Sequence, residues 1–164
     1  MTDIDARVRA SLDALGVPYE VMRIDPDFAD TARFCEKYGI PPANSANTII
    51  VASKKEPKQY CACVVLATTR LDVNHAVKKL MGASRVSFAS SEETMALTGM
   101  MIGGVTVFAL PPDVPLYVDD RLMALDWLIL GGGGRDTKIR TSPEVFRRMP
   151  STRIVPGLAT DADA

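Results

Sequence analysis

Two glycine-rich runs are the parts of this sequence whose residue types and spacing could support chemistry. The first contains Gly99, Gly103 and Gly104 and lies in an apolar segment, residues 97–110. A membrane-spanning helix needs about 20 apolar residues, and two prolines end this segment too early. A dinucleotide-binding loop needs the order Gly-x-Gly-x-x-Gly before a helix, which this run lacks. The run therefore predicts a loop whose backbone N–H groups either bind an oxyanion or carbonyl or only turn a corner.

The second run, Gly131–Gly134, directly follows an apolar segment, Trp127–Leu130, and leads into Arg135. Lys and Arg outnumber acidic residues over residues 133–148. Arg135 and Lys138 are accordingly candidates for a phosphate contact, although a solvated basic face is the commoner explanation of such a run.

Composition excludes several other functions. The chain has 164 residues, of which 47% are hydrophobic and 24% charged, as expected for one globular domain. Its net charge of −1 argues against broad DNA or RNA binding, which needs a basic surface. A single histidine, His75, is expected on a solvated helix face, so a zinc site is not predicted. Cys35, Cys61 and Cys63 are expected to be reduced, and the first residues do not resemble a targeting segment, which predicts a cytoplasmic protein.

Hydrophobic periodicity and capping residues predict the elements that would position these runs. In chain order we expect a helix over 4–15, a strand over 19–24, a helix over 31–38, strands over 48–52 and 60–66, a helix between Asp72 and Gly82, a strand over 86–88, a helix from the Ser90–Glu93 capping box to Thr98, strands over 105–110, 116–118 and 127–130, and a helix from Ser142.

Strands and short helices are mixed in this pattern without regular alternation. We therefore predict an α+β fold, with a single domain and a mixed, mostly antiparallel central sheet flanked by short helices. The domain is expected to span residues 1–155, and residues 156–164 are expected to form a flexible C-terminal tail.

Four pieces of the sequence, in this order and spacing, resemble the YbaK family, the prolyl-tRNA synthetase-associated domain. They are Thr48–Val51, Leu71–Val73, Leu97–Val105, and the apolar strand that runs into Gly131-Gly132 ahead of Ser142–Glu144. The resemblance covers about residues 4–155 and implies a YbaK-like fold. It also implies a deacylase that acts in trans and hydrolyses the ester of a mischarged aminoacyl-tRNA. The implied partner is the tRNA acceptor end, with an aminoacyl-tRNA synthetase as a further candidate; no cofactor, metal, membrane or DNA is implied.

The same resemblance implies which residues form the site. Gly103 and Gly104 match the loop whose N–H groups approach the aminoacyl carbonyl, and Gly131 and Gly132 match a second loop at the same pocket. The implied catalytic residues are Asn47, Gly103 and Gly104. The implied substrate-binding residues are Gly99, Ile102, Gly131, Gly132, Arg135 and Lys138.

Departures from the family pattern leave a second function open. Active members carry a lysine at the place of Asn47, and an asparagine offers a neutral amide instead of a charge. Val107 and Ala109 stand where the family has proline and glycine, and Leu130 stands where some members have serine. The alternative is a catalytically degenerate module that binds a tRNA acceptor end, a small molecule or a protein partner. A third interpretation is that both glycine loops are only turns.

Overall fold

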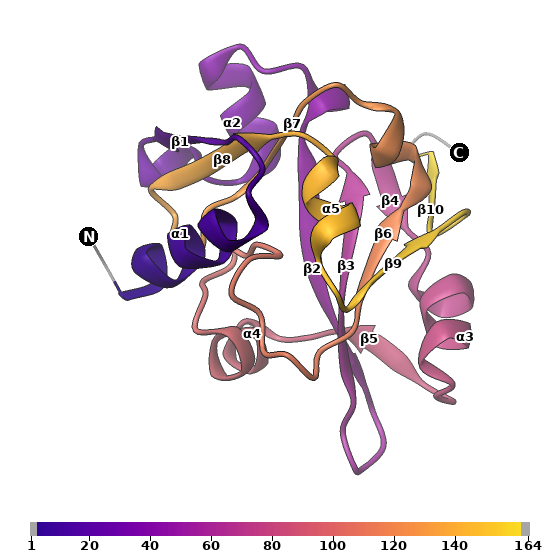
Figure 1. Ribbon diagram of the computed structural model, residues 1–164. Helices are drawn as coiled ribbons and strands as arrows, with labels where there is room; N and C mark the ends of the chain where they lie inside the picture. Colours follow the sequence, from indigo (N-terminus) through magenta and orange to yellow (C-terminus); the bar gives the residue numbers. More distant parts are fainter. Residues whose placement is uncertain (1–2, 162–164) are drawn as a thin grey trace.

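The computed structural model describes residues 3–161, and its largest sheet has five strands (Figure 1). These strands are β5 (Val86–Phe88), β2 (Ala46–Ser53), β3 (Tyr60–Leu66), β6 (Leu116–Asp119) and β9 (Thr152–Val155), in spatial order. β2 is antiparallel to both of its neighbours, whereas β6 is parallel to β3 and β9. The central sheet is therefore mixed, and the predicted α+β class is confirmed.

Two smaller antiparallel sheets complete the strand pairing. One has the order β1 (Glu20–Arg23), β8 (Thr137–Thr141) and β7 (Leu128–Gly131). The other pairs β10 (Ala159–Asp161) with β4 (Thr69–Leu71). The sequence patterns did not predict β4, β8, β9 or β10.

Five α-helices pack on these sheets. They are α1 (Asp3–Leu15), α2 (Thr31–Tyr38), α3 (Lys78–Met81), α4 (Ser91–Thr98) and α5 (Glu144–Arg148). Short 3₁₀ helices span Pro26–Phe28, Pro42–Asn44 and Asp120–Ala124, and a π-helical turn, Val73–Val77, precedes α3. Buried residues of α1 and α5 share one core cluster with β2, β3 and β6. The turn before α3 belongs to a cluster on the other face of that sheet, and α2 covers the three-stranded sheet.

The strand expected over residues 105–110 is not formed, and this prediction was wrong. Val105, Val107 and Phe108 are buried, but they lie in an irregular loop. Ala109 adopts a φ of 64°, which an extended strand does not contain. The apolar run reflects burial in the core and not strand pairing.

The prediction of a flexible tail from Pro156 is also wrong for residues 156–161. Leu158 is fully buried, and Ala159–Asp161 pairs with β4 as β10. Burial of one leucine and a strand partner fix this segment although it begins with a proline and a glycine. Residues 162–164 lie outside the described part of the chain.

His75 and the three cysteines lie where the sequence predicts them. The side chain of His75 is 87% exposed and lies beside Asp72, which caps the helical turn. The three cysteines are free and buried, and Cys61 and Cys63 point to one face of β3 with their sulfurs 3.8 Å apart.

The arrangement of the sheets leaves one edge of β2 facing two other parts of the molecule. In Figure 1 the three-stranded sheet lies to the upper left of β2, and α4 with the loop after it lies to the lower left. Both glycine runs belong to these parts, because the first follows α4 and the second connects β7 to β8.

Candidate functional site

A cavity of about 450 Å³ lies between this edge of β2 and the two glycine loops. It brings together segments that are far apart in the sequence. Its polar lining residues are Asp30, Thr31, Asn47, Thr48, Thr94 and Lys138, and the remainder of its lining consists of Ala46, Ile49, Ile50, Phe88, Ala89, Ile102, Gly103, Val105 and Gly131. Of the residues implied by the resemblance, the structure therefore gathers Asn47, Ile102, Gly103, Gly131 and Lys138 around one space.

Asn47 is held in this wall by the start of α2. Its Oδ1 accepts a hydrogen bond from the hydroxyl of Thr31. Because this bond uses the carboxamide oxygen, the NH₂ group is the part of Asn47 that can meet a ligand. The pair also borders a second cavity of about 410 Å³, so Thr31 and Asn47 stand between two adjoining spaces.

The first glycine loop begins at a helix end. Gly99 closes α4 in the left-handed conformation, with a φ of 74°, and its N–H donates to the carbonyl of Met95. This is a helix C-cap, and Gly99 does not line the cavity. Gly103 does line it, and its φ of 94° is a conformation that favours glycine.

Gly104 contacts the second loop, not the cavity. Its N–H donates to the carbonyl of Met101 at 2.8 Å, and its own carbonyl accepts from the N–H of Gly133 at 2.7 Å. A Cβ at Gly104 would lie 2.6 Å from the backbone of Gly134. The missing side chain therefore allows two loops to touch, and the N–H of Gly104 is already used.

The second loop shows the same close packing. A Cβ at Gly131 would collide with the carbonyl of Val105, and one at Gly132 would collide with the side chain of Thr137. Gly131 lines the cavity and Gly132 does not. A Cβ at Gly103 would likewise collide with the guanidinium of Arg135, so all four glycines implied at the pocket make close contacts within the protein.

Arg135, at the end of the second glycine loop, forms hydrogen bonds to the first loop. Its guanidinium donates to the carbonyl of Ile102 at 2.7 Å and to that of Pro26 at 3.1 Å. It also lies 3.4 Å from the carboxylate of Asp30. The structure thus places Arg135 against the backbone of the first loop, where it positions Gly103.

Lys138 is the buried cation of the cavity. It lies on β8 and is only 6% exposed. Its Nζ is 3.4 Å from the carbonyl oxygen of Gly103 and 5.3 Å from the centre of the Phe34 ring. Within residues 3–161 it forms no ion pair. Burial is the main cause that lowers the pKa of Lys138 to about 8; Arg135 acts in the same direction, whereas Asp30 and Cys35 oppose it.

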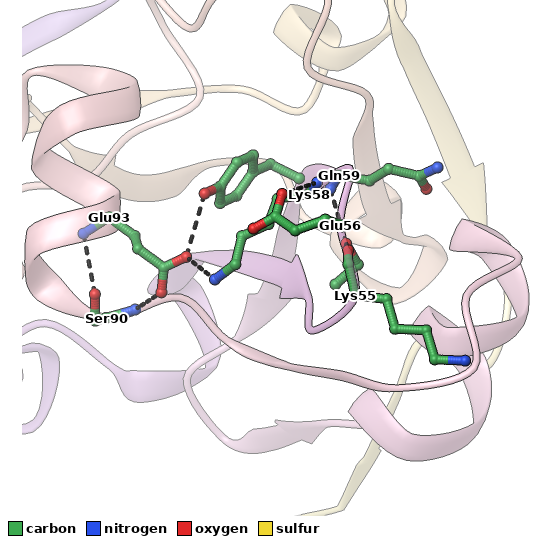
Figure 2. A network of polar contacts seen from close by, with 8 residues as sticks. Lys55, Glu56, Lys58, Gln59, Ser90 and Glu93 are labelled. Atoms are coloured by element: carbon green, nitrogen blue, oxygen red, sulfur yellow. Dashed lines mark hydrogen bonds and ion pairs between the residues drawn. The ribbon is translucent and has the colours of Figure 1, made fainter.

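A polar network holds α4, and with it one wall of the cavity (Figure 2). Ser90 and Glu93 form a capping box at the start of α4. The carboxylate of Glu93 also accepts from Lys58 at 2.9 Å and from the hydroxyl of Tyr60 at 3.2 Å. The hydrogen bond from Lys58 is the largest cause that lowers the pKa of Glu93 to about 2. Thr94, the next residue of α4, lines the cavity.

The lining also includes residues that sequence reasoning did not select. The sequence predicts Thr31 only as the start of a helix and Thr48 only as part of a strand, and Asp30 directly precedes that helix. Phe88, another residue that the sequence did not select, lines the cavity with 58% of its surface exposed. Ile102, which the resemblance does imply, lines the cavity and is 51% exposed. An exposed aromatic residue beside a cavity is a surface on which a base could stack.

In residues 3–161, no group of three or more His, Cys, Asp or Glu side chains is placed to hold a metal ion. None of the helices in the same range is long and apolar enough to cross a membrane.

The chain is similar in sequence and in structure to known proteins. A family model described as an aminoacyl-tRNA editing domain matches residues 25–149. The chain is similar to the crystal structure of a hypothetical protein, with 26% identity, a TM-score of 0.82, and 94% of this chain and 99% of that chain covered. It is also similar to a candidate trans-editing enzyme for prolyl-tRNA synthetase, with 19% identity, a TM-score of 0.81, and 99% of both chains covered.

Proposed function

Because the chain belongs to the aminoacyl-tRNA editing domain family, we propose that it hydrolyses the ester of a mischarged aminoacyl-tRNA, acting in trans. The observation that carries this proposal is the cavity that joins β2, the first glycine loop and the buried ammonium group of Lys138. The family supports a role in tRNA editing, and the cavity suggests how the ester is held.

The aminoacyl ester lies in the cavity with its carbonyl directed at Lys138. The ester is already activated, so orientation and polarisation of the carbonyl account for much of the catalysis. The ammonium group is desolvated and forms no ion pair with a carboxylate of residues 3–161, which strengthens its interaction with an oxyanion. Asn47 orients the ribose or the carbonyl through its NH₂ group, and Gly103 lies at the same wall.

The reaction is a hydrolysis. A water oxygen bonds to the carbonyl carbon, and the carbonyl oxygen takes the negative charge beside Lys138. The bond between this carbon and the ribose oxygen then breaks. The ribose oxygen receives one proton and the water loses one, so the products are the free amino acid and the uncharged tRNA.

In this proposal the acceptor end of tRNA reaches the cavity past Phe88 and Ile102. Phe88 offers a face for the terminal adenine, since base stacking on an aromatic side chain contributes roughly 1–3 kcal/mol. The protein acts in the cytoplasm, where charged tRNA is found, and an aminoacyl-tRNA synthetase is the protein partner to test.

The test is release of the amino acid from a panel of mischarged aminoacyl-tRNAs. We expect one or more of them to be deacylated faster than in buffer, and Lys138→Met to reduce kcat/KM by about 10²–10³-fold, the usual effect of removing an oxyanion partner. Lys55→Met is the matched control, because Lys55 is exposed on the β2–β3 hairpin. If no tRNA decays faster than in buffer, the proposal is wrong.

One observation favours a second candidate, a module that binds without turnover. The resemblance expects a lysine at position 47, and the chain has a neutral amide there. This candidate predicts saturable binding of an aminoacyl-tRNA with no hydrolysis. It also predicts that Asn47→Lys creates activity that the natural chain lacks.

A further inference from the structure

The edge of β2 that faces the cavity lacks a strand partner along part of its length. On its other side β2 pairs with β3 from Ala46 to Ala52. On the cavity side, β5 pairs only from Val51 onward, and an isolated bridge joins Ser45 to Ile129. Within the described chain, the edge between these two points is therefore open.

The hydrogen bonds on either side of β2 show which residues face this opening. In an antiparallel pair, the N–H and C=O of one residue point to the same side, and successive residues point to opposite sides. The carbonyl of Ser45 accepts from the N–H of Ala67, next to β3, whereas the carbonyl of Ile50 accepts from the N–H of Ala89 on the opposite side. Thr48 lies two residues before Ile50, so its N–H and C=O point to the same side as those of Ile50 and face the open edge.

Thr48 is also one of the residues that line the cavity. Its Oγ1 is buried and, among residues 3–161, has no hydrogen-bond partner. The side chain of a strand residue stands out of the plane of the sheet, so it is the N–H and C=O of Thr48 that face the open edge. An unpaired strand edge presents N–H and C=O groups to which a polar ligand can bind, and Thr48 supplies one of each.

We propose that the open edge of β2 binds the aminoacyl group by backbone pairing. The N–H of Thr48 donates to the ester carbonyl, and the C=O of Thr48 accepts from the α-ammonium group. An aminoacyl ester carries these two groups on either side of one Cα, as a peptide residue does, so it can form the two-bond ring of an antiparallel pair. This proposal rests on the proposed function, because the ligand is the substrate of that reaction.

Backbone pairing would also set stereochemical preference. Two L-residues joined by such a ring direct their side chains to the same face of the sheet. The side chain of an L-aminoacyl group would then lie on the Thr48 face, beside Ala46 and Ile50, which belong to the apolar core. A D-aminoacyl side chain would point to the opposite face, toward Asn47. The ligand class is therefore an L-aminoacyl ester with a free α-amino group.

The test follows the amide hydrogen of Thr48 by NMR. The probe is 3′-deoxy-3′-(L-alanylamino)adenosine, in which an amide replaces the ester. At saturation we expect exchange of the Thr48 amide with solvent to slow at least 10-fold. The amide of Ile49 points to β3 and is the internal control, with unchanged exchange. The form without the α-amino group, 3′-deoxy-3′-(propionylamino)adenosine, and the D-alanyl form should bind at least 10-fold more weakly, and Thr48→Val should retain backbone protection.

The outcomes separate this proposal from the proposed function. If the full chain deacylates tRNA and binds the probe while Thr48 exchange is unchanged, the edge proposal is wrong and the deacylase survives. Equal affinity for the propionyl form also overturns it, because that form has no N–H to donate to the C=O of Thr48. A chain that neither binds the probe nor deacylates any tRNA refutes both.

Discussion

Replacing Lys138 with methionine should make the protein more stable and less active. The ammonium group is charged at neutral pH and, within the described part of the chain, makes one long hydrogen bond, to the carbonyl of Gly103 at 3.4 Å. Burial lowers its pKa from 10.5 to about 8, which corresponds to a cost of about 3 kcal/mol for keeping the charge in the folded state. Methionine fills similar space without a charge, so we expect a gain of about 2–3 kcal/mol in the free energy of unfolding at pH 7.

The pH dependence identifies the charge as the cause. Below pH 8 the lysine is protonated in both folded and unfolded chains, and its full cost is present. Between pH 8 and 10.5 the folded chain releases the proton first, so the natural protein gains stability relative to Lys138→Met. Above pH 10.5 both states are neutral, and the two proteins should differ least.

Urea unfolding at pH 7 and at pH 10.5 measures both quantities, provided that the m-values agree. Lys138→Arg is the control, because arginine stays charged and should give no gain at either pH. If Lys138→Met is destabilised at pH 7, or if its gain is equal at both pH values, the cation is not desolvated as described. Loss of deacylation with gain of stability would identify Lys138 as a residue retained for function at the expense of stability.

Three further predictions concern the framework of the cavity. Gly104→Ala should cost about 3 kcal/mol in urea unfolding and abolish deacylation, because the new Cβ meets the backbone of Gly134; Gly39→Ala, with open space around it, should cost about 1 kcal/mol and leave activity intact. Equal effects of the two would contradict the loop contact. Ser90→Ala should cost about 1 kcal/mol and lower Tm by roughly 2–4 °C, since it removes the N-cap of α4; an unchanged Tm in calorimetry would refute this. The stability that Glu93 supplies over Glu93→Gln should be complete above pH 4.5 and disappear as the pH falls toward 2, because the pKa of this carboxyl is lowered when folded. A difference that stays constant over this range of pH would show that the charge is not involved.

Much of the framework follows from local signals in the sequence. The capping box at Ser90 and the left-handed Gly99 placed α4 and the start of the first glycine loop correctly. Alternation and apolar runs likewise located β2 and β3. These features depend on residues within a few positions of each other, so no tertiary information is needed.

The site could not be predicted to the same extent, because its side chains are placed by long-range packing. Lys138 and Arg140 alternate with Ile139 on β8, as on a strand with one solvated face. Arg140 does remain exposed, stacked over Trp127 at 4.1 Å, but Lys138 is covered because α2 lays Phe34 over it. Helix α2 lies about 100 residues earlier in the chain, and nothing local to β8 indicates this cover.

The roles of the glycines also needed the structure. A glycine in a loop allows close approach either of a ligand or of another loop, and the sequence does not show which of the two is present. The bond between Gly133 and Gly104 shows that the loops approach each other. Of the four glycines implied at the pocket, Gly103 and Gly131 line the cavity, and Gly104 and Gly132 do not.

The short opening in the edge of β2 has a consequence for association between protein chains. An exposed strand edge is a template on which another chain can add, and this is a common route to aggregation. Here the bridge at Ser45 and the start of β5 close the edge on both sides of Thr48, and the glycine loops stand in front of it. The gap admits a single amino-acid unit but not the several consecutive residues of a foreign strand. The same closure that would restrict the ligand to one residue therefore protects the protein from self-association through β2.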